Sequence, residues 1–88
     1  MIHECIADIA SREPGRSAVI HKQSRVTYGE LNSGILRTGS FLLRDGLRTG
    51  DRVVILMENS PEYIMSYLGV QKAGGIAVPS IPSILQMN

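Results

Sequence analysis

The clearest change between apolar and polar positions lies in the second half of the chain. Residues 53–57 form an unbroken apolar run, which is typical of a short strand that needs cover on both faces. Residues 60–73 space their apolar side chains as a helix does, and Gly74 ends the helix because glycine accepts a left-handed conformation. Residues 76–78 form a second apolar strand, closed by Pro79. Strand, helix and strand with short connections predict a right-handed parallel β-α-β unit.

The first part of the chain predicts a helix followed by a hairpin. Residues 2–12 place their apolar side chains on one helical face, formed by Ile2, Cys5, Ile6, Ile9 and Ala10. His3 lies off that face. Residues 17–22 and 25–27 have the character of strands, and Gln23-Ser24 between them predicts a tight connection.

A longer helix follows the hairpin. Thr27 and Glu30 fit a capping box, in which each side chain bonds the backbone N–H of the other residue. The helix is predicted to reach about residue 45, with Gly46 at its stop and a wide apolar stripe made by Leu31, Ile35, Leu36, Leu42 and Leu43. Gly34 and Gly39 each cost roughly 1 kcal/mol inside a helix, which indicates either close approach of a neighbouring element or simple tolerance.

The predicted fold class is therefore α/β: helix, β-hairpin, helix and a right-handed β-α-β unit. The chain offers few strands to flank residues 53–57, and an exposed parallel edge is an aggregation hazard. The pattern resembles the start of a larger doubly wound sheet.

Composition limits the classes of function. The chain has 88 residues and a net charge of +1, so neither nucleic acid nor an anionic membrane is an expected partner. Cys5 is the only cysteine, which fits a reducing, cytoplasmic location. The N-terminus lacks the basic and apolar regions of a signal peptide, and no apolar run approaches the ~20 residues of a transmembrane helix.

Two segments could suggest a phosphate site, and both have a structural explanation. Lys72-Ala73-Gly74-Gly75 follows a helix, whereas a phosphate loop places its glycines before one. Lys72 instead complements the negative end of the helix. Residues 58–60 precede a helix N-terminus, but Glu58 repels anions, and Ser60 or Asn59 is expected only to cap.

The remaining polar residues form no catalytic arrangement. His3 and His21 have no ligand spacing to an acid or to Cys5, which we expect to be a buried, inert thiol. No serine has a glycine-flanked elbow or a paired histidine. The arginines (Arg25, Arg37, Arg44, Arg48 and Arg52) are expected on a solvated face, and the tyrosines (Tyr28, Tyr63 and Tyr67) in packing. We therefore assign no catalytic, cofactor-binding or metal-binding residue to this stretch.

Two motifs together resemble those of adenylate-forming, or AMP-binding, enzymes. Residues 25–32, Arg-Val-Thr-Tyr-Gly-Glu-Leu-Asn, resemble the first motif of that superfamily, which includes acyl-CoA synthetases, peptide-synthetase adenylation domains and luciferases. Residues 50–53, 59–63 and 71–79 resemble its second region, and the resemblance covers residues 2 to about 82. Asn-Ser-Pro-Glu at 59–62 is closer to acyl-CoA synthetases, whereas residues 79–82 match neither common ending and residues 83–88 diverge from what usually follows.

This resemblance implies that residues 1–88 are the N-terminal portion of the large AMP-binding domain of a ligase. The family activates a carboxylic acid with ATP and magnesium and commonly passes the acyl group to a thiol such as coenzyme A, as in fatty acid metabolism. The motifs that bind ATP and the catalytic lysine lie downstream of the matched region, so Lys72 is not that lysine. We expect this stretch alone to bind no cofactor and to be inactive.

Two alternatives remain open from the sequence. The chain could be a stand-alone interaction or regulatory module derived from such an enzyme, or a piece of an amino-acid adenylation domain. The expected partner is the remainder of the enzyme chain, or a protein that covers the open sheet.

Overall fold

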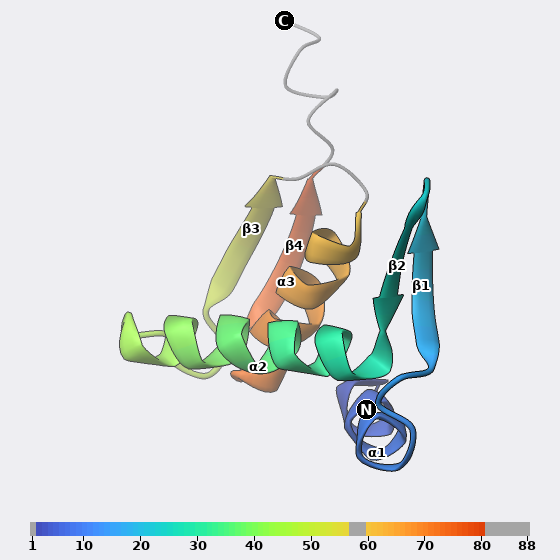
Figure 1. Ribbon diagram of the computed structural model, residues 1–88. Coiled ribbons are helices and arrows are strands. Elements are labelled where there is room, and N and C mark those ends of the chain that lie inside the picture. The colour runs from blue at the N-terminus through green and yellow to red at the C-terminus, as the bar shows by residue number, and fades with distance from the viewer. Residues whose placement is uncertain (1, 57–59, 81–88) are drawn as a thin grey trace, which may run out of the picture.

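The computed structural model describes residues 2–56 and 60–80, which form three helices and two small sheets (Figure 1). In chain order the elements are α1 (Ile2–Arg12), β1 (Ser17–His21), β2 (Ser24–Thr27), α2 (Tyr28–Arg44), β3 (Arg52–Leu56), α3 (Pro61–Lys72) and β4 (Ile76–Ser80). Strands β1 and β2 pair antiparallel, and β3 and β4 pair parallel. This confirms the α/β class and the predicted order of elements. No helix within the described ranges is long and apolar enough to cross a membrane.

The β3-α3-β4 unit has the predicted parallel pairing, with Arg52 opposite Ile76 at one end of the register. The strand β4 is longer than predicted, because it continues through Pro79 to Ser80 instead of closing after residue 78. Proline lacks a backbone N–H but is tolerated in an edge strand, where that donor has no partner to bond. Strand β3 begins one residue earlier than predicted, and its expected last residue, Met57, lies outside the described residues.

The two ends of α3 follow the predicted capping chemistry. Ser60 is the N-cap, and its Oγ accepts a hydrogen bond from the backbone N–H of Tyr63 at 3.3 Å. Pro61 occupies the first turn, where its missing N–H costs nothing. Gly74 has φ 92°, the left-handed conformation expected at a helix stop.

The hairpin turn lies one residue earlier than predicted. His21 pairs with Ser24, so the two turn residues are Lys22 and Gln23, not Gln23 and Ser24. Lys22 has φ 58°, an uncommon conformation for a residue with a side chain. Nothing in the residue type of Lys22 indicated this conformation, because glycine and asparagine are the residues that usually adopt it.

Close packing of α2 on α3 organises the core, and Figure 1 shows the two helices crossing. A Cβ atom on Gly69 would lie 2.6 Å from the Cβ of Thr38, and one on Gly34 would overlap the side chain of Met65. Of the two explanations offered for the glycines inside α2, close approach of a neighbour is therefore correct for Gly34, whereas a Cβ on Gly39 would make only an ordinary contact at 3.4 Å. The apolar residues buried around the crossing are Ile6, Leu31, Ile35 and Leu68.

The predicted apolar stripe of α2 is too wide. Leu31 and Ile35 are buried, but Leu36 and Leu43 are exposed. The side of α2 that meets α3 carries Gly34, Thr38 and Gly39, and the small residues on it let the helix axes approach. Leu36 and Leu43 lie outside this side and point away from the core.

The buried face of α1 is also rotated from the predicted one. His3 is only 8% exposed, whereas Cys5 and Ile2 are exposed, so the prediction that Cys5 is a buried thiol is wrong. Helix α1 packs on α2 and α3 through the row that contains His3 and Ile6. Both rows carry isoleucines, and the position of the neighbouring helices decides which row is buried.

Candidate functional site

One face of the β3–β4 sheet is open and apolar. Side chains alternate along each strand, so Val54 and Leu56 of β3 lie on the same face as Ile76 and Val78 of β4. Val54 and Leu56 are 58% and 55% exposed. The opposite face is covered by α3, and Ile55 on that side is only 4% exposed. The described part of the apolar run, residues 53–56, thus has cover on one face only within the described chain.

The edges of this sheet are open as well. In the described residues β3 and β4 pair only with each other, and Figure 1 shows the β1–β2 hairpin standing apart from them. A parallel strand with a bare apolar face and a free edge is a template for further pairing. Fully burying a valine or leucine side chain stabilises a protein by roughly 1.5–3 kcal/mol, so covering this face would have a strong driving force. The exposed apolar face and the free strand edges are the properties of a surface that packs against further protein.

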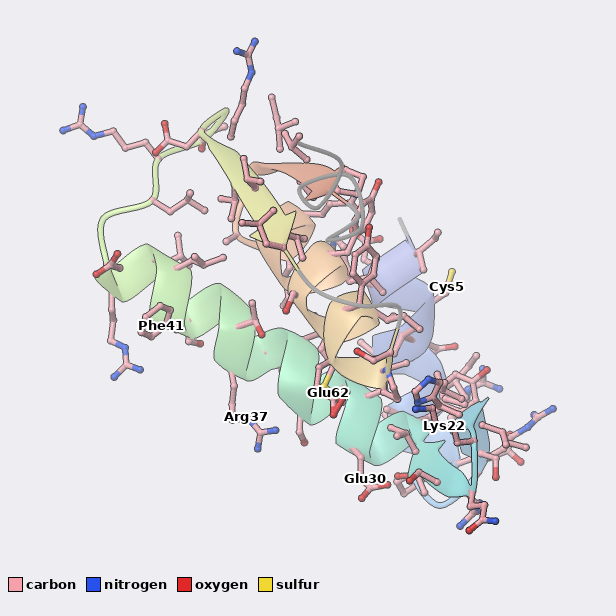
Figure 2. All side chains as sticks on the ribbon, turned by 90° about the horizontal axis from the view of Figure 1, so that it is seen from above. Cys5, Lys22, Glu30, Arg37, Phe41 and Glu62 are labelled. Carbon is pink, nitrogen blue, oxygen red and sulfur yellow. The ribbon has the colours of Figure 1, made fainter. Side chains whose placement is uncertain are left out.

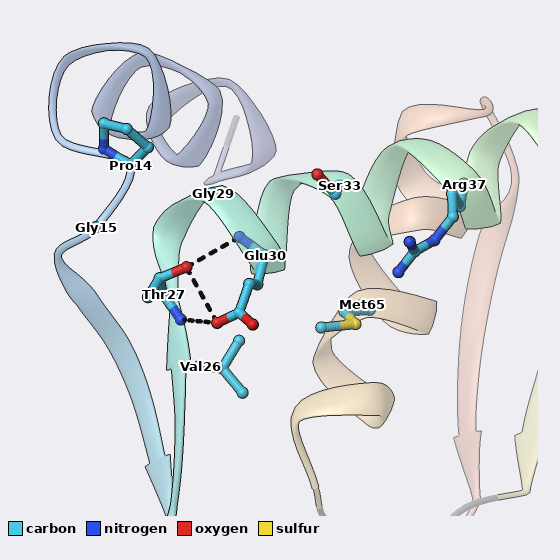
Figure 3. Close-up of a pocket in the computed structure, with 9 residues that line it drawn as sticks. All are labelled: Pro14, Gly15, Val26, Thr27, Gly29, Glu30, Ser33, Arg37 and Met65. Carbon is cyan, nitrogen blue, oxygen red and sulfur yellow. Dashed lines mark hydrogen bonds between the residues drawn. The ribbon is translucent and has the colours of Figure 1, made fainter.

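A second feature is a hollow of about 740 Å³ beside the start of α2 (Figure 3). It is lined by Pro14, Gly15, Val26, Thr27, Gly29, Glu30, Ser33, Arg37 and Met65. Two of its hydrogen-bonding residues, Thr27 and Glu30, are already engaged with each other. The Thr27 backbone N–H donates to Glu30 Oε1 at 2.9 Å, and the Glu30 N–H donates to Thr27 Oγ1 at 3.1 Å.

The same contacts set the charge state of Glu30. Hydrogen bonds from the backbone N–H and the hydroxyl of Thr27 hold the pKa of the Glu30 carboxyl below its ordinary value, and the nearby cation Arg25 acts in the same direction. A depressed pKa makes this carboxylate a poor proton carrier near neutral pH. The capping box predicted from the sequence is confirmed, and Glu30 stabilises the helix start rather than taking part in acid–base chemistry.

The polar residues weighed from the sequence fall in structural positions. Lys72 is exposed in the last turn of α3, and Ser60 caps the start of that helix. Arg25 donates a hydrogen bond to the Gly15 carbonyl oxygen at 2.6 Å and also bonds Ser17. The other arginines considered are exposed, as expected. Residues 58 and 59 lie outside the described residues.

The three tyrosines take part in packing, as predicted. Tyr28 and Tyr67 pack against the core, and Tyr63 stacks on Tyr67 with ring centroids 6.4 Å apart. Across residues 2–56 and 60–80, no three side chains of His, Cys, Asp or Glu come together as a metal site would require. Sequence reasoning did not anticipate the hollow, because its lining comes from three separate stretches of the chain, 14–15, 26–37 and 65, and follows no period.

Within the described residues, the parallel β3-α3-β4 unit is covered by α3 on one face only, and α2 and α3 begin at defined caps. The family model described as "AMP-binding enzyme" matches residues 6–85. The chain belongs to this family, and the resemblance to adenylate-forming enzymes drawn from residues 25–32 and 50–79 is confirmed.

Relatives in the family include both acyl-CoA ligases and peptide synthetases. The chain is 33% identical over 81 residues to a long-chain-fatty-acid–CoA ligase of Bacillus subtilis (strain 168), covering 92% of this chain and 14% of the relative. It is 35% identical over 83 residues to tyrocidine synthase 2 of Brevibacillus parabrevis, covering 94% of this chain and 2% of the relative. The chain therefore spans a small part of the curated relatives it matches.

A solved structure matches the same region. The N-terminal subdomain of NpsA from Klebsiella oxytoca superposes with a TM-score of 0.81 and 32% sequence identity, covering 92% of this chain and 21% of that chain. The described residues thus share their fold with part of the N-terminal subdomain of NpsA.

Proposed function

We propose that this chain is the N-terminal portion of the AMP-binding domain of an ATP-dependent carboxylate-activating ligase, and that it serves there as structural scaffold. The open apolar face formed by Val54, Leu56, Ile76 and Val78 is the observation that supports this role. In the complete enzyme this face would be covered by the remainder of the chain, within a larger doubly wound sheet. The small share of each relative that the chain spans supports the same proposal.

The proposed reaction of the complete enzyme joins a carboxylic acid to AMP from ATP, releasing pyrophosphate. The acyl group then passes to a thiol, for which we propose coenzyme A. The acyl-CoA ligase among the relatives and the Asn-Ser-Pro-Glu sequence at 59–62 support this version. Amino-acid adenylation in a peptide synthetase is the alternative, supported by the similarity to a tyrocidine synthase.

The helix starts among the described residues lack the features that bind nucleotide phosphates. Nucleotide phosphates bind where a helix N-terminus has free N–H groups behind a glycine-rich loop. The starts of α2 and α3 instead bond their own caps, Thr27 and Ser60, and neither follows such a loop. We therefore derive no catalytic step from this stretch and propose that it is inactive alone.

Pyrophosphate release tests this proposal. The 88-residue chain is incubated with ATP, magnesium and a long-chain fatty acid, beside the full-length polypeptide encoded by the same gene. We expect release from the full-length polypeptide and none from the 88-residue chain. Turnover by the 88-residue chain would contradict the scaffold role, whereas inactivity of a longer polypeptide toward a broad panel of carboxylic acids, amino acids included, would contradict the ligase assignment.

The state of the 88-residue chain in solution distinguishes a fragment from a stand-alone module. Aggregation or loss of cooperative unfolding would support the fragment, because the open face would be exposed to water. A monodisperse chain that unfolds cooperatively would support a module derived from the enzyme. The intact mass of the protein in its source cells addresses the same choice directly.

A further inference from the structure

The solvent side of α2 combines exposed apolar side chains with two cations. Leu36 and Phe41 are 44% and 59% exposed. Together with Arg37, Ser40 and Arg44 they line a surface hollow of about 410 Å³, here called the α2 groove. Arg37 and Phe41 project from the side of the helix that is turned away from α3 (Figure 2).

The geometry of a helix orders these side chains into rows. Residues turn by about 100° each, so Arg37 and Arg44, seven positions apart, fall in one row along the axis about 10 Å long. Leu36 lies on one flank of this row and Phe41 on the other. The α2 groove is thus a line of positive charge between two apolar flanks.

The two cations of the groove are not compensated. Within the described residues, neither Arg37 nor Arg44 has a hydrogen bond or an ion pair, whereas Arg12 bonds Asp8 at 2.7 Å. No carboxylate lines the groove: Asp45 lines a different hollow, and Glu30, which lines the hollow of Figure 3 together with Arg37, bonds Thr27. A ligand of complementary charge would therefore meet two free guanidinium groups, which bind carboxylates through paired hydrogen bonds.

We propose that the α2 groove binds an amphipathic helix of a partner protein, with two carboxylates seven residues apart set between apolar side chains. Carboxylates with that spacing would face Arg37 and Arg44, and the apolar residues beside them would contact Leu36 and Phe41. Apolar contact supplies most of the affinity in such a helix-in-groove complex, and the charge pairs set its register and specificity. This surface is separate from the open face of the sheet, and its role does not depend on which acid the enzyme activates.

The order of the rows favours a protein helix over a membrane. A helix that lies on a membrane has one continuous apolar face with cations on its polar side. Here the arginine row divides the apolar residues, so insertion of Leu36 and Phe41 into lipid would also bury the charges. Two cations are also fewer than the four to eight typical of recognition of anionic lipids.

A designed helical peptide of about 18 residues tests the proposal, because shorter helices are marginal in water. It carries two glutamates seven residues apart, each flanked by leucines, and its binding to the full-length polypeptide is measured by fluorescence anisotropy. A matched peptide has lysines in place of the glutamates. We expect saturable binding of the glutamate peptide only, weakening as sodium chloride rises from about 50 to about 300 mM.

Variants of the groove locate the binding. The double substitution Arg37→Glu with Arg44→Glu should weaken binding of the glutamate peptide by about tenfold or more. Phe41→Ser should weaken binding of the glutamate peptide as well, by removing one apolar flank. Arg48→Glu is the control, because it reverses one charge at an exposed position outside the groove. Circular dichroism of each variant should match that of the parent polypeptide.

Several results would overturn the proposal. They are absence of binding, equal binding of the two peptides, and unchanged affinity in the double arginine variant. Binding of phosphatidylserine vesicles without binding of the glutamate peptide would assign the groove to a membrane and would equally contradict a protein partner.

Discussion

At the residue scale, the start of α2 depends on one threonine and one glutamate that bond each other's backbone groups. Replacing Thr27 by alanine removes the hydroxyl that accepts the Glu30 N–H. Loss of such a cap costs about 1 kcal/mol. We expect faster amide hydrogen exchange in the first turn of α2 in the Thr27→Ala variant, measured by mass spectrometry. Ser40→Ala, on the exposed side of the same helix, is the control and should leave exchange in that turn unchanged.

The charge of Glu30 predicts a pH dependence at the same place. Because the pKa of Glu30 is lowered in the fold, the ionised carboxylate is stabilised, and that stabilisation is present above the pKa of the unfolded chain. It is lost as the pH falls through the lower, folded pKa. We expect protection of the first turn of α2 to decrease on acidification below about pH 4, the ordinary range of a glutamate. Glu30→Gln should show a smaller decrease, and an equal decrease in both would contradict this role.

His3 is a third residue with a clear expectation. It is buried on α1, and its Nδ1 has no hydrogen-bond partner among the described residues. A buried polar group without a partner costs free energy, so His3→Leu should leave the free energy of unfolding unchanged or raise it by about 1 kcal/mol. Ile6→Ala in the same row should lower it by about 2–4 kcal/mol. Urea unfolding measures both, and a loss above about 1 kcal/mol for His3→Leu would indicate a partner for Nδ1.

At the element scale, the crossing of α2 and α3 depends on glycine. A Cβ on Gly69 would meet the Cβ of Thr38 at 2.6 Å, whereas one on Gly15 would meet nothing within 4 Å. We expect Gly69→Ala to lower the free energy of unfolding by about 1–3 kcal/mol and Gly15→Ala to change it by less than about 0.5 kcal/mol. In a double-mutant cycle, Thr38→Gly should reduce the cost of Gly69→Ala. Additive effects would show that Thr38 is not the obstacle.

Signals confined to a few neighbouring residues allowed the elements to be predicted. Thr27 with Glu30 and Ser60 with Pro61 fix where α2 and α3 begin, because caps act within one turn. The rotation of each helix about its axis could not be predicted in this way. It depends on where other elements lie, which is why His3, Cys5 and Leu36 were assigned to the wrong faces.

Of the two candidate surfaces, one could be predicted from local sequence signals and the other could not. The open sheet could be expected because the sequence shows both an unbroken apolar run and few strands to flank it. The α2 groove was not predicted, because Leu36 was assigned to the buried stripe and Arg37 to a general solvated face. Only the position of α3 shows that the two residues share an exposed side.

At the scale of the whole molecule, the open face should behave oppositely in the short and the full-length chains. In the 88-residue chain Val54 is exposed, so Val54→Lys should reduce self-association and leave the helices intact. If the remainder of the chain covers this face as proposed, the same lysine would be buried without a partner in the full-length polypeptide, and we expect a loss of several kcal/mol in stability or a loss of soluble protein. Leu43→Lys, which makes the same change at an exposed position on α2, should be tolerated in both chains.

Sedimentation velocity of the short chain and thermal unfolding of the long one measure the two effects of Val54→Lys. The comparison distinguishes self-association through the open face from self-association through any exposed apolar residue, because Leu43→Lys removes a similar exposed apolar area. If both substitutions reduce self-association equally, the open face has no special part in it. If the full-length polypeptide tolerates Val54→Lys, Val54 stays exposed in the complete fold, and the proposed covering of β3 and β4 by the remainder of the chain is wrong.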